Sequence, residues 1–376
     1  MIPRWRPGPF PLLLLLLHAY IGVRLLAPVA PAVQACGVLV LAACFLSLPK
    51  GWVVPETGSP WKDLVPWTAM GFFSWLFVLT LLRDAVLLAA WAILPAAALA
   101  RAVHGSALGV MVAAPLVTAA GFHFARRVAN VVEVRVPIEG LAPALEGFTI
   151  AQISDVHVGP TIKRPYVEAI VERVNALHAD VVAITGDLVD GPVQRLASHT
   201  APLAGLRSRH GTYFVTGNHE YYSGAYAWID ELRRLGARVL LNEHVMIDHG
   251  GAAVALAGVT DYSAHHFDRA HRSDPARASQ GVPPGAVKVL LAHQPRTAPD
   301  AERAGFDLQL SGHTHGGQFW PWNHFVRLQQ PFTAGLRRLG HMWVYVSRGT
   351  GYWGPPMRFG SPSEITRITL TTSVGK

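Results

Sequence analysis

Several polar residues in the second half of the chain are of the types that bind divalent metal ions. They are Asp155, His157, Asp187, Asn218, His293, His313 and His315. Imidazole and carboxylate ligands together suit borderline divalent ions such as Mn²⁺, Fe²⁺ or Zn²⁺. The chain's two cysteines, Cys36 and Cys44, lie in an apolar segment near the N-terminus, and the lack of thiolates here argues against a structural zinc site. These residues therefore predict a metal centre built from nitrogen and oxygen ligands.

The polar residues follow short apolar runs that have the length of β-strands. These runs span residues 149–153, 181–185, 213–216, 287–292 and 308–310, and a further run spans 253–259. Helical patterns at 165–177 and 225–235 alternate with the first three runs, which predicts an α/β domain with buried strands. In open α/β sheets, ligands gather outside the carboxyl ends of the strands. We therefore expect the polar residues to converge on one spot.

A carboxylate in the middle of such a cluster can hold two ions at once. Two ions about 3.5–4 Å apart clamp the attacking and leaving oxygens of an in-line displacement. We expect Asp187 to bridge the two ions.

Each of these residues has a simpler explanation when it is taken singly. Asp155 or Asp187 after a strand is often a helix cap, and a lone His293 is more often a core residue than a ligand. These explanations do not predict a suitable residue after each of these strands. The metal centre is therefore the better interpretation of the whole set.

The same residues lie in five motifs that resemble those of a known family. The motifs are Asp155-Val156-His157, Gly186-Asp187-Leu188-Val189-Asp190, Gly217-Asn218-His219-Glu220, His293 and Gly312-His313-Thr314-His315. In type and order they resemble the five blocks of the calcineurin-like metallophosphoesterases, over about residues 148–372. Gly217 to Tyr222 and the Gly-Gly-Gln after His315 are similar to the bacterial membrane-associated phosphodiesterase branch. The resemblance implies a four-layer α/β/β/α sandwich with a dinuclear metal site.

The resemblance also implies a role for each residue. It assigns Asp155, His157 and His315 to one metal, Asn218, His293 and His313 to the other, and Asp187 to both. His219 would face the substrate, stabilise transition-state charge and protonate the leaving oxygen, while Asp190 would orient His219. A water shared by the two ions, of which Mn²⁺ is favoured over Fe²⁺ and Zn²⁺, would attack phosphorus. The expected reaction is hydrolysis of a phosphodiester, a phosphomonoester or a pyrophosphate.

The N-terminal third of the chain is nearly free of charge and predicts an all-α transmembrane helical bundle. Of the 376 residues, 51% are hydrophobic and 15% are charged, where soluble domains average about 25% charged residues. Spans are expected at 10–28, 32–49, 64–84 and 106–125, and Ala85 to Ala100 is either a fifth span or an interfacial helix. A signal peptide would explain only the first stretch. We expect membrane helices at 1–128, a linker at 129–147 and the phosphoesterase domain at 148–372.

The number of spans decides which side of the membrane the second domain occupies. With four spans, six basic residues share one side, which the positive-inside tendency makes cytoplasmic. These residues are Arg4, Arg6, Lys50, Lys62, Arg126 and Arg127. With five spans, Arg126, Arg127 and the domain after them lie outside. We favour four spans, and so the cytoplasmic face of a bacterial inner membrane.

The net charge of +8 fits a protein that faces anionic lipid. No basic run interleaved with aromatic residues is present, so a nucleic-acid partner is not expected. Anchoring suggests a phosphorylated small molecule or a lipid-linked substrate. Related membrane-associated enzymes of the family cleave UDP-diacylglucosamine, a step in lipid A synthesis, which makes this nucleotide lipid one candidate. The alternatives are a transport or scaffold module that the phosphoesterase domain regulates, and a domain that binds metal without activity.

For several other polar residues, the sequence gives a less specific expectation of where they lie. His265, His266 and His271 lie in a polar loop that we expect to be solvated. Tyr221 and Tyr222 either line the mouth of the pocket or pack beneath it. Arg348 either holds a substrate phosphate or lies on the surface.

Overall fold

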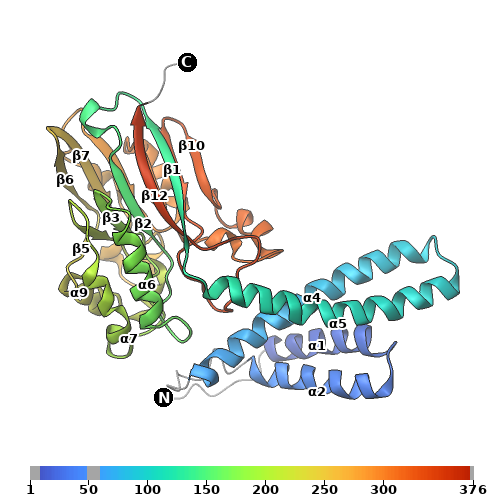
Figure 1. Ribbon diagram of the computed structural model, residues 1–376. Coiled ribbons are helices and arrows are strands. Elements are labelled where there is room, and N and C mark those ends of the chain that lie inside the picture. The colour runs from blue at the N-terminus through green and yellow to red at the C-terminus, as the bar shows by residue number, and fades with distance from the viewer. Residues whose placement is uncertain (1–8, 49–59, 373–376) are drawn as a thin grey trace. The chain divides into compact units, whose positions relative to one another are not determined.

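A computed structural model describes residues 9–48 and 60–372 of the chain, which form two compact units (Figure 1). The first unit contains the N-terminal helices up to Phe124 together with Gly354–Met357. The second unit contains Ala125–Trp353 and the chain from Arg358 onward. Arg4, Arg6 and Lys50, on which the expected membrane orientation partly depends, lie outside the described residues.

Four apolar helices make up the first unit within the described residues. They are α1 (Pro9–Leu26), α2 (Pro31–Ser47), α4 (Pro60–Trp91) and α5 (Ala96–Arg126). Three of them, α1, α4 and α5, are long and apolar enough to cross a membrane. The fourth, α2, is apolar but has only 17 residues, at the lower limit for a span. Many leucine and valine side chains on these helices are exposed, as expected for surfaces that face lipid.

The segment Ala85 to Ala100 is not a helix of its own. Helix α4 continues through Arg83 and Asp84 to Trp91, and α5 begins at Ala96. The break falls just before Pro95 because the residue that precedes a proline is disfavoured in helical geometry. The residues considered as a fifth span therefore form the end of α4 and the start of α5.

The charged residues Arg83 and Asp84 do not interrupt α4, because other polar side chains pair with them. Asp84 accepts hydrogen bonds from Arg24 Nε at 2.7 Å and from the Tyr20 hydroxyl at 2.6 Å. Arg83 pairs with Asp84 at 3.0 Å and donates to the Ser106 hydroxyl at 2.9 Å. Charged residues inside membrane segments usually pair with one another in this way.

Two mixed six-stranded sheets form the centre of the second unit. The first sheet has the order β1-β12-β2-β3-β4-β5, and the second has the order β10-β11-β9-β8-β7-β6. The first comprises β1 (Asn130–Ile138), β2 (Thr149–Ile153), β3 (Val181–Ile184), β4 (Thr212–Phe214), β5 (Arg238–Val239) and β12 (Glu364–Thr372). The second comprises β6 (Glu243–His249), β7 (Ala252–Gly258), β8 (Val287–Leu291), β9 (Leu308–Ser311), β10 (Gly335–Leu339) and β11 (Met342–Val346). Strands β2, β3, β4 and β5 run parallel, as do β7, β8, β9 and β11.

The two sheets pack face to face, and helices cover their outer faces. Ile150 and Val181 of the first sheet share one core with Leu256 and Val289 of the second. A second core joins the outer face of the first sheet to α6 (Arg164–Asn175), α7 (Val193–Thr200) and α9 (Ala225–Arg234). A third core joins the second sheet to α10 (Pro275–Ser279) and α11 (Ala298–Arg303). This arrangement confirms the four-layer α/β/β/α sandwich.

The apolar runs of the sequence correspond closely to the inner strands. Every residue of β2, β3 and β9 is buried, as expected for strands that are covered on both faces. The segment expected to be a linker, 129–147, contains a strand. Its first part forms β1, which pairs in parallel with β12 over nine residues and is the edge strand of the first sheet (Figure 1).

Candidate metal centre

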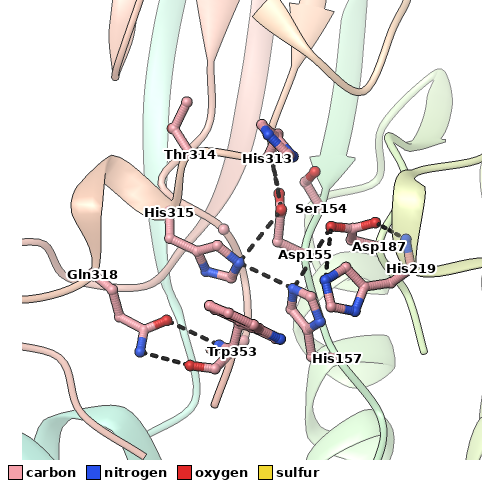
Figure 2. Close-up of polar contacts among 12 residues, drawn as sticks. Ser154, Asp155, His157, Asp187, His219, His313, Thr314, His315, Gln318 and Trp353 are labelled. Atoms are coloured by element: carbon pink, nitrogen blue, oxygen red, sulfur yellow. Dashed lines mark hydrogen bonds and ion pairs between the residues drawn. The ribbon is translucent and has the colours of Figure 1, made fainter. Parts of the chain in front are cut away.

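The predicted ligands lie just beyond the carboxyl ends of the central strands of both sheets (Figure 2). Asp155 and His157 follow β2, Asp187 follows β3, and Asn218 begins the short helix α8 (Asn218–Ser223) after β4. His293 follows β8, while His313 and His315 follow β9. Because the two sheets pack against each other, these loops meet at one edge of the sandwich.

One group of potential ligands consists of Asp155, His157 and His315. Nε2 of His157 lies 3.0 Å from Nε2 of His315, and Nε2 of His315 lies 3.5 Å from Oδ1 of Asp155. The donor atoms of all three residues lie within 4.8 Å of one another. The three side chains are buried, so a cation between them would be largely shielded from solvent.

A second group consists of Asp187, His293 and His313. Nε2 of His293 lies 3.0 Å from Oδ2 of Asp187 and 3.2 Å from Nδ1 of His313. Oδ2 of Asp187 also lies 4.0 Å from Nε2 of His157, which belongs to the first group. The Asp187 carboxylate therefore lies between the two groups, where a bridging ligand is needed.

Asn218 provides an independent test of whether this site fits a metal ion. Its Oδ1 is buried and has no hydrogen-bond partner among the described residues. Buried polar atoms nearly always have a partner, so such an atom calls for an explanation. An amide oxygen that binds a cation needs no hydrogen bond. The residues present thus fit a centre of two divalent ions.

Five of the potential ligands adopt a left-handed backbone conformation. The φ angles are 53° for Asp155, 54° for His157, 50° for Asp187, 69° for His313 and 50° for His315. This conformation is uncommon for residues other than glycine, and each instance costs on the order of 1–3 kcal/mol. Only eight residues other than glycine among those described have a positive φ, so backbone strain is concentrated in this centre.

His219 and Asp190 lie beside the two groups and contact each other. Oδ1 of Asp190 is 2.6 Å from Nδ1 of His219 and 2.9 Å from Nδ1 of His157. The Asp190 carboxylate therefore orients two histidines, whereas the sequence suggested only one. Nε2 of His219 lies 4.0 Å from Oδ2 of Asp187, so the free nitrogen of this ring faces the centre.

Glu220 supports the centre from behind, a role that we did not assign from the sequence. Its buried carboxylate accepts hydrogen bonds from the backbone N–H groups of Gly217 at 2.6 Å, Leu188 at 2.8 Å and Asp187 at 3.0 Å. These bonds tie the loop after β3 to the loop after β4. Burial raises the pKa of Glu220 to about 7, with the Asp187 carboxylate as the next cause.

Arg358 is a second supporting residue that no sequence motif indicated. Its buried guanidinium donates to the carbonyl oxygen of His315 at 2.9 Å and to the carbonyl oxygens of Gly351 and Ser361. The guanidinium also lies 3.1 Å from Nδ1 of His315. Arg358 thus fixes the main chain around one ligand, and its acceptors are backbone atoms that carry no signature in the sequence.

Burial and the charges of neighbouring side chains give the potential ligands different protonation states. Burial raises the pKa of Asp155. Burial also acts to raise the pKa of Asp187, but His293 and His219 outweigh it and hold that pKa well below its usual range. Burial lowers the pKa of His313 to about 3 and that of His315 well below its usual range. These two imidazoles are therefore neutral at pH 7, the form that binds metals.

His219 and Asp190 form a charged pair at neutral pH. Burial acts to lower the pKa of His219, but the Asp187 and Asp190 carboxylates outweigh it and raise that pKa to about 9. Burial acts to raise the pKa of Asp190, but His157 and His219 bring it down to about 2. The pair therefore holds an imidazolium, which can donate a proton, next to the ligand groups.

Glycines allow the loops to approach one another closely. A Cβ atom on Gly217 would overlap the carboxylate and backbone nitrogen of Asp187, and one on Gly312 would overlap Ser154 and Asp155. Neither position tolerates a side chain without displacing a potential ligand.

Exposed aromatic rings border the centre. The ring of His219 lies 5.1 Å from that of Tyr222 and 5.9 Å from that of Trp353, and Tyr222 in turn contacts Phe267. Tyr222, Trp353 and Phe267 are 62%, 52% and 54% exposed. These rings form an apolar rim beside the polar site, and Figure 2 labels Trp353 and His219.

The structure shows where three further side chains near the site lie, which the sequence left open. Tyr221 packs beneath the rim, where its hydroxyl lies 2.7 Å from Nδ1 of His271. His271 is buried, so the expectation that this histidine is solvated was wrong. Arg348 is half-buried and pairs with the buried Glu364 at 2.9 Å.

A four-layer sandwich with two groups of metal-binding side chains at the ends of its central strands defines a metallophosphoesterase domain. The model of the calcineurin-like phosphoesterase family matches residues 148–317. A protein of Campylobacter jejuni described as an uncharacterized metallophosphoesterase is 34% identical over 266 residues, which cover 70% of this chain and 69% of that protein. The chain therefore belongs to the calcineurin-like metallophosphoesterase family.

Two vertebrate proteins are also similar to this chain. Each is described as a transmembrane protein with a metallophosphoesterase domain. The relative from Bos taurus is 43% identical over 276 residues, which cover 70% of this chain and 62% of that protein. The relative from Danio rerio is 41% identical over 249 residues, which cover 64% of this chain and 57% of that protein. The chain thus spans about three fifths of the length of these relatives. Together with the three long apolar helices, these descriptions indicate a membrane protein.

Proposed function

We propose that the second unit hydrolyses a phosphate ester or anhydride bond with the help of two divalent cations. The observation that carries this proposal is the pair of ligand groups that share the Asp187 carboxylate. One cation would be held by Asp155, His157 and His315, the other by Asn218, His293 and His313, and both by Asp187. When bound, the two cations would polarise the phosphoryl group and acidify a shared water.

His219 would act on the leaving group. Its imidazolium is 16% exposed at the side of the centre, where it can contact a substrate. It would stabilise negative charge on the phosphoryl group and donate its proton to the departing oxygen. Asp190 is a positioning residue because it contacts the far nitrogen of this ring and of His157.

The direct test is hydrolysis of bis(p-nitrophenyl) phosphate by the purified full-length protein with Mn²⁺. His219→Ala should greatly lower turnover without loss of the bound metal, whereas His266→Ala, in an exposed part of the loop, should change neither. No turnover of this diester or of any monoester by metal-loaded protein would overturn the proposal. A variant His219→Ala with full turnover would show that the domain works without this acid.

We further propose Mn²⁺ as the working metal. The centre offers imidazole nitrogens, carboxylate oxygens and an amide oxygen, a mixture that suits Mn²⁺, Fe²⁺ and Zn²⁺ alike, with Mn²⁺ best matched to its share of oxygen ligands. Reconstitution of chelator-treated protein with each ion should restore the highest rate with Mn²⁺. A higher rate with Zn²⁺ or Fe²⁺ would reverse this order.

A lipid-linked phosphate is the substrate class that we propose, with UDP-diacylglucosamine as the most specific candidate. The apolar rim formed by Tyr222, Phe267 and Trp353 supports it, because these rings offer surface for an apolar or aromatic part of a substrate. Membranes that contain the protein should release UMP from this nucleotide lipid. No release of UMP, with turnover of the simple diester intact, would remove this candidate and leave the hydrolase.

We also propose that the domain lies on the cytoplasmic face of a bacterial inner membrane. Four helices return the chain to its starting side, and Lys62, Arg126 and Arg127 fit the positive-inside tendency on that side. A compartment-sensitive reporter fused after Lys376 should report the cytoplasm. A periplasmic signal would exclude cytoplasmic nucleotide lipids as substrates.

A further inference from the structure

Three side chains at the opposite end of the sandwich form another group of potential ligands. Asp180 immediately precedes β3, His210 precedes β4, and His249 is the last residue of β6. The proposed dinuclear centre lies beyond the other ends of β3 and β4. Asp187 comes seven positions after Asp180, which at about 3.3 Å per extended residue places the two sites roughly 20 Å apart.

We propose that Asp180, His210 and His249 bind a Zn²⁺ ion that links the two sheets. Nε2 of His210 lies 3.1 Å from Nδ1 of His249, and Nδ1 of His249 lies 3.8 Å from Oδ1 of Asp180. The three donor atoms lie within 4.8 Å of one another. A tetrahedral Zn²⁺ with bonds of about 2.0–2.2 Å separates its ligand atoms by roughly 3.3 Å. Small side-chain movements would therefore suffice to admit the ion.

The Asp180 carboxylate is held with one oxygen available. Its Oδ2 accepts hydrogen bonds from the backbone N–H and the hydroxyl of Thr149, both at 2.9 Å. Its Oδ1 is left to face His249. Ligands of structural and catalytic metals are commonly oriented by such hydrogen bonds. The carboxylate thus presents one oxygen in a fixed direction.

The two imidazoles are held against a buried ring. Phe148 is stacked against His210 at 6.2 Å and packs edge-on against His249 at 5.1 Å. The backbone of His210 is fixed as well, because its N–H donates to the carbonyl oxygen of Asp180 at 2.7 Å.

This ion would add a link between the two sheets at this end of the sandwich. Asp180 and His210 belong to the first sheet, and His249 belongs to the second. The side chains of Asp180 and His249 are 18% and 16% exposed, so an ion can reach them from solvent. Because Zn²⁺ would bind only the folded state, it should raise the unfolding temperature.

The proposal is tested by counting Zn²⁺ per chain in full-length protein that has been stripped with a chelator and dialysed against Zn²⁺. His249→Gln and Asp180→Asn should each bind one equivalent less than the unmodified protein and hydrolyse bis(p-nitrophenyl) phosphate at its rate. His341→Gln is the matched control because His341 lies between β10 and β11, away from β6, and should keep the full count. The increase in unfolding temperature caused by Zn²⁺ should be smaller in the first two variants than in the control.

Equal Zn²⁺ counts in the unmodified protein and in both variants would overturn the proposal. Loss of Zn²⁺ together with loss of hydrolysis would also overturn it, because the missing ion would then belong to the dinuclear centre. Asp180→Asn decides the question if His249→Gln does not fold, since asparagine keeps an acceptor oxygen for Thr149. The Zn²⁺ counts and the unfolding temperatures do not depend on whether the domain proves to be a hydrolase.

Discussion

Replacement of Asp190 by asparagine removes a negative charge while it keeps the shape of the side chain. Its Oδ1 accepts hydrogen bonds from His219 at 2.6 Å and from His157 at 2.9 Å. A hydrogen bond to a charged group is worth about 1.5–3 kcal/mol and a neutral one about 0.5–1.5 kcal/mol. The change therefore weakens each bond by about 1–1.5 kcal/mol, and about 1.4 kcal/mol corresponds to a factor of ten.

Two separate measurements should each report one of these bonds. The weaker bond to His219 should lower kcat for bis(p-nitrophenyl) phosphate about tenfold. The weaker bond to His157 should raise the Mn²⁺ concentration needed for half-maximal activity, within the 10–100-fold range typical of such partners. Asp190→Ala removes the acceptor altogether, and a loss of about 1.5–3 kcal/mol per bond predicts a fall of about 10- to 150-fold in kcat.

A double variant distinguishes orientation of His219 from a general loss of structure. In the His219→Ala background, Asp190→Asn should cause no further fall in kcat because its partner in that step is already absent. It should still weaken Mn²⁺ binding through His157. Unchanged kcat and Mn²⁺ dependence in Asp190→Ala, or effects of the two changes on kcat that simply multiply, would refute the reasoning.

Three further perturbations test the support of the centre. Removal of metal with a chelator should lower the unfolding temperature, and Mn²⁺ should restore it, because bound cations compensate the buried carboxylates; an unchanged temperature would argue against a cation site. Glu220→Ala leaves three buried N–H groups without their acceptor, at about 1–3 kcal/mol each, and should lower both thermal stability and kcat. Gly217→Ala should destabilise the protein by about 1–3 kcal/mol and reduce metal content, whereas Gly205→Ala, where a Cβ meets only ordinary contacts, should do neither; equal effects of the two changes would contradict the steric argument.

The inner strands and the position of the site were predictable from the sequence for a physical reason. A strand that is covered on both faces must be apolar along its whole length, so β2 and β3 stand out as continuous apolar runs. The polar residues that follow these runs are equally visible because nothing else in the fold explains them.

Features that depend on distant partners were not predictable in this way. Arg358 donates to the carbonyl oxygen of His315, 43 residues earlier in the chain, and no pattern of side chains records such a bond. Arg83 and Asp84 place charges within an apolar helix, and the partner of Asp84 is Arg24, 60 residues earlier in the chain. Outer strands such as β6 alternate between buried and exposed residues and have no continuous apolar run.

The parallel pairing of β1 with β12 has a consequence for the order in which the protein is made. Among the strands that the structure describes, β12 is the only neighbour of β1, and Asn130 pairs with Glu364, which the ribosome adds 234 residues later. The first strand to emerge after the last membrane helix must therefore wait, unpaired, until β12 has been made. A ribosome that stops short of β12 would leave both β1 and β2 with open edges, so an incomplete chain cannot close its first sheet.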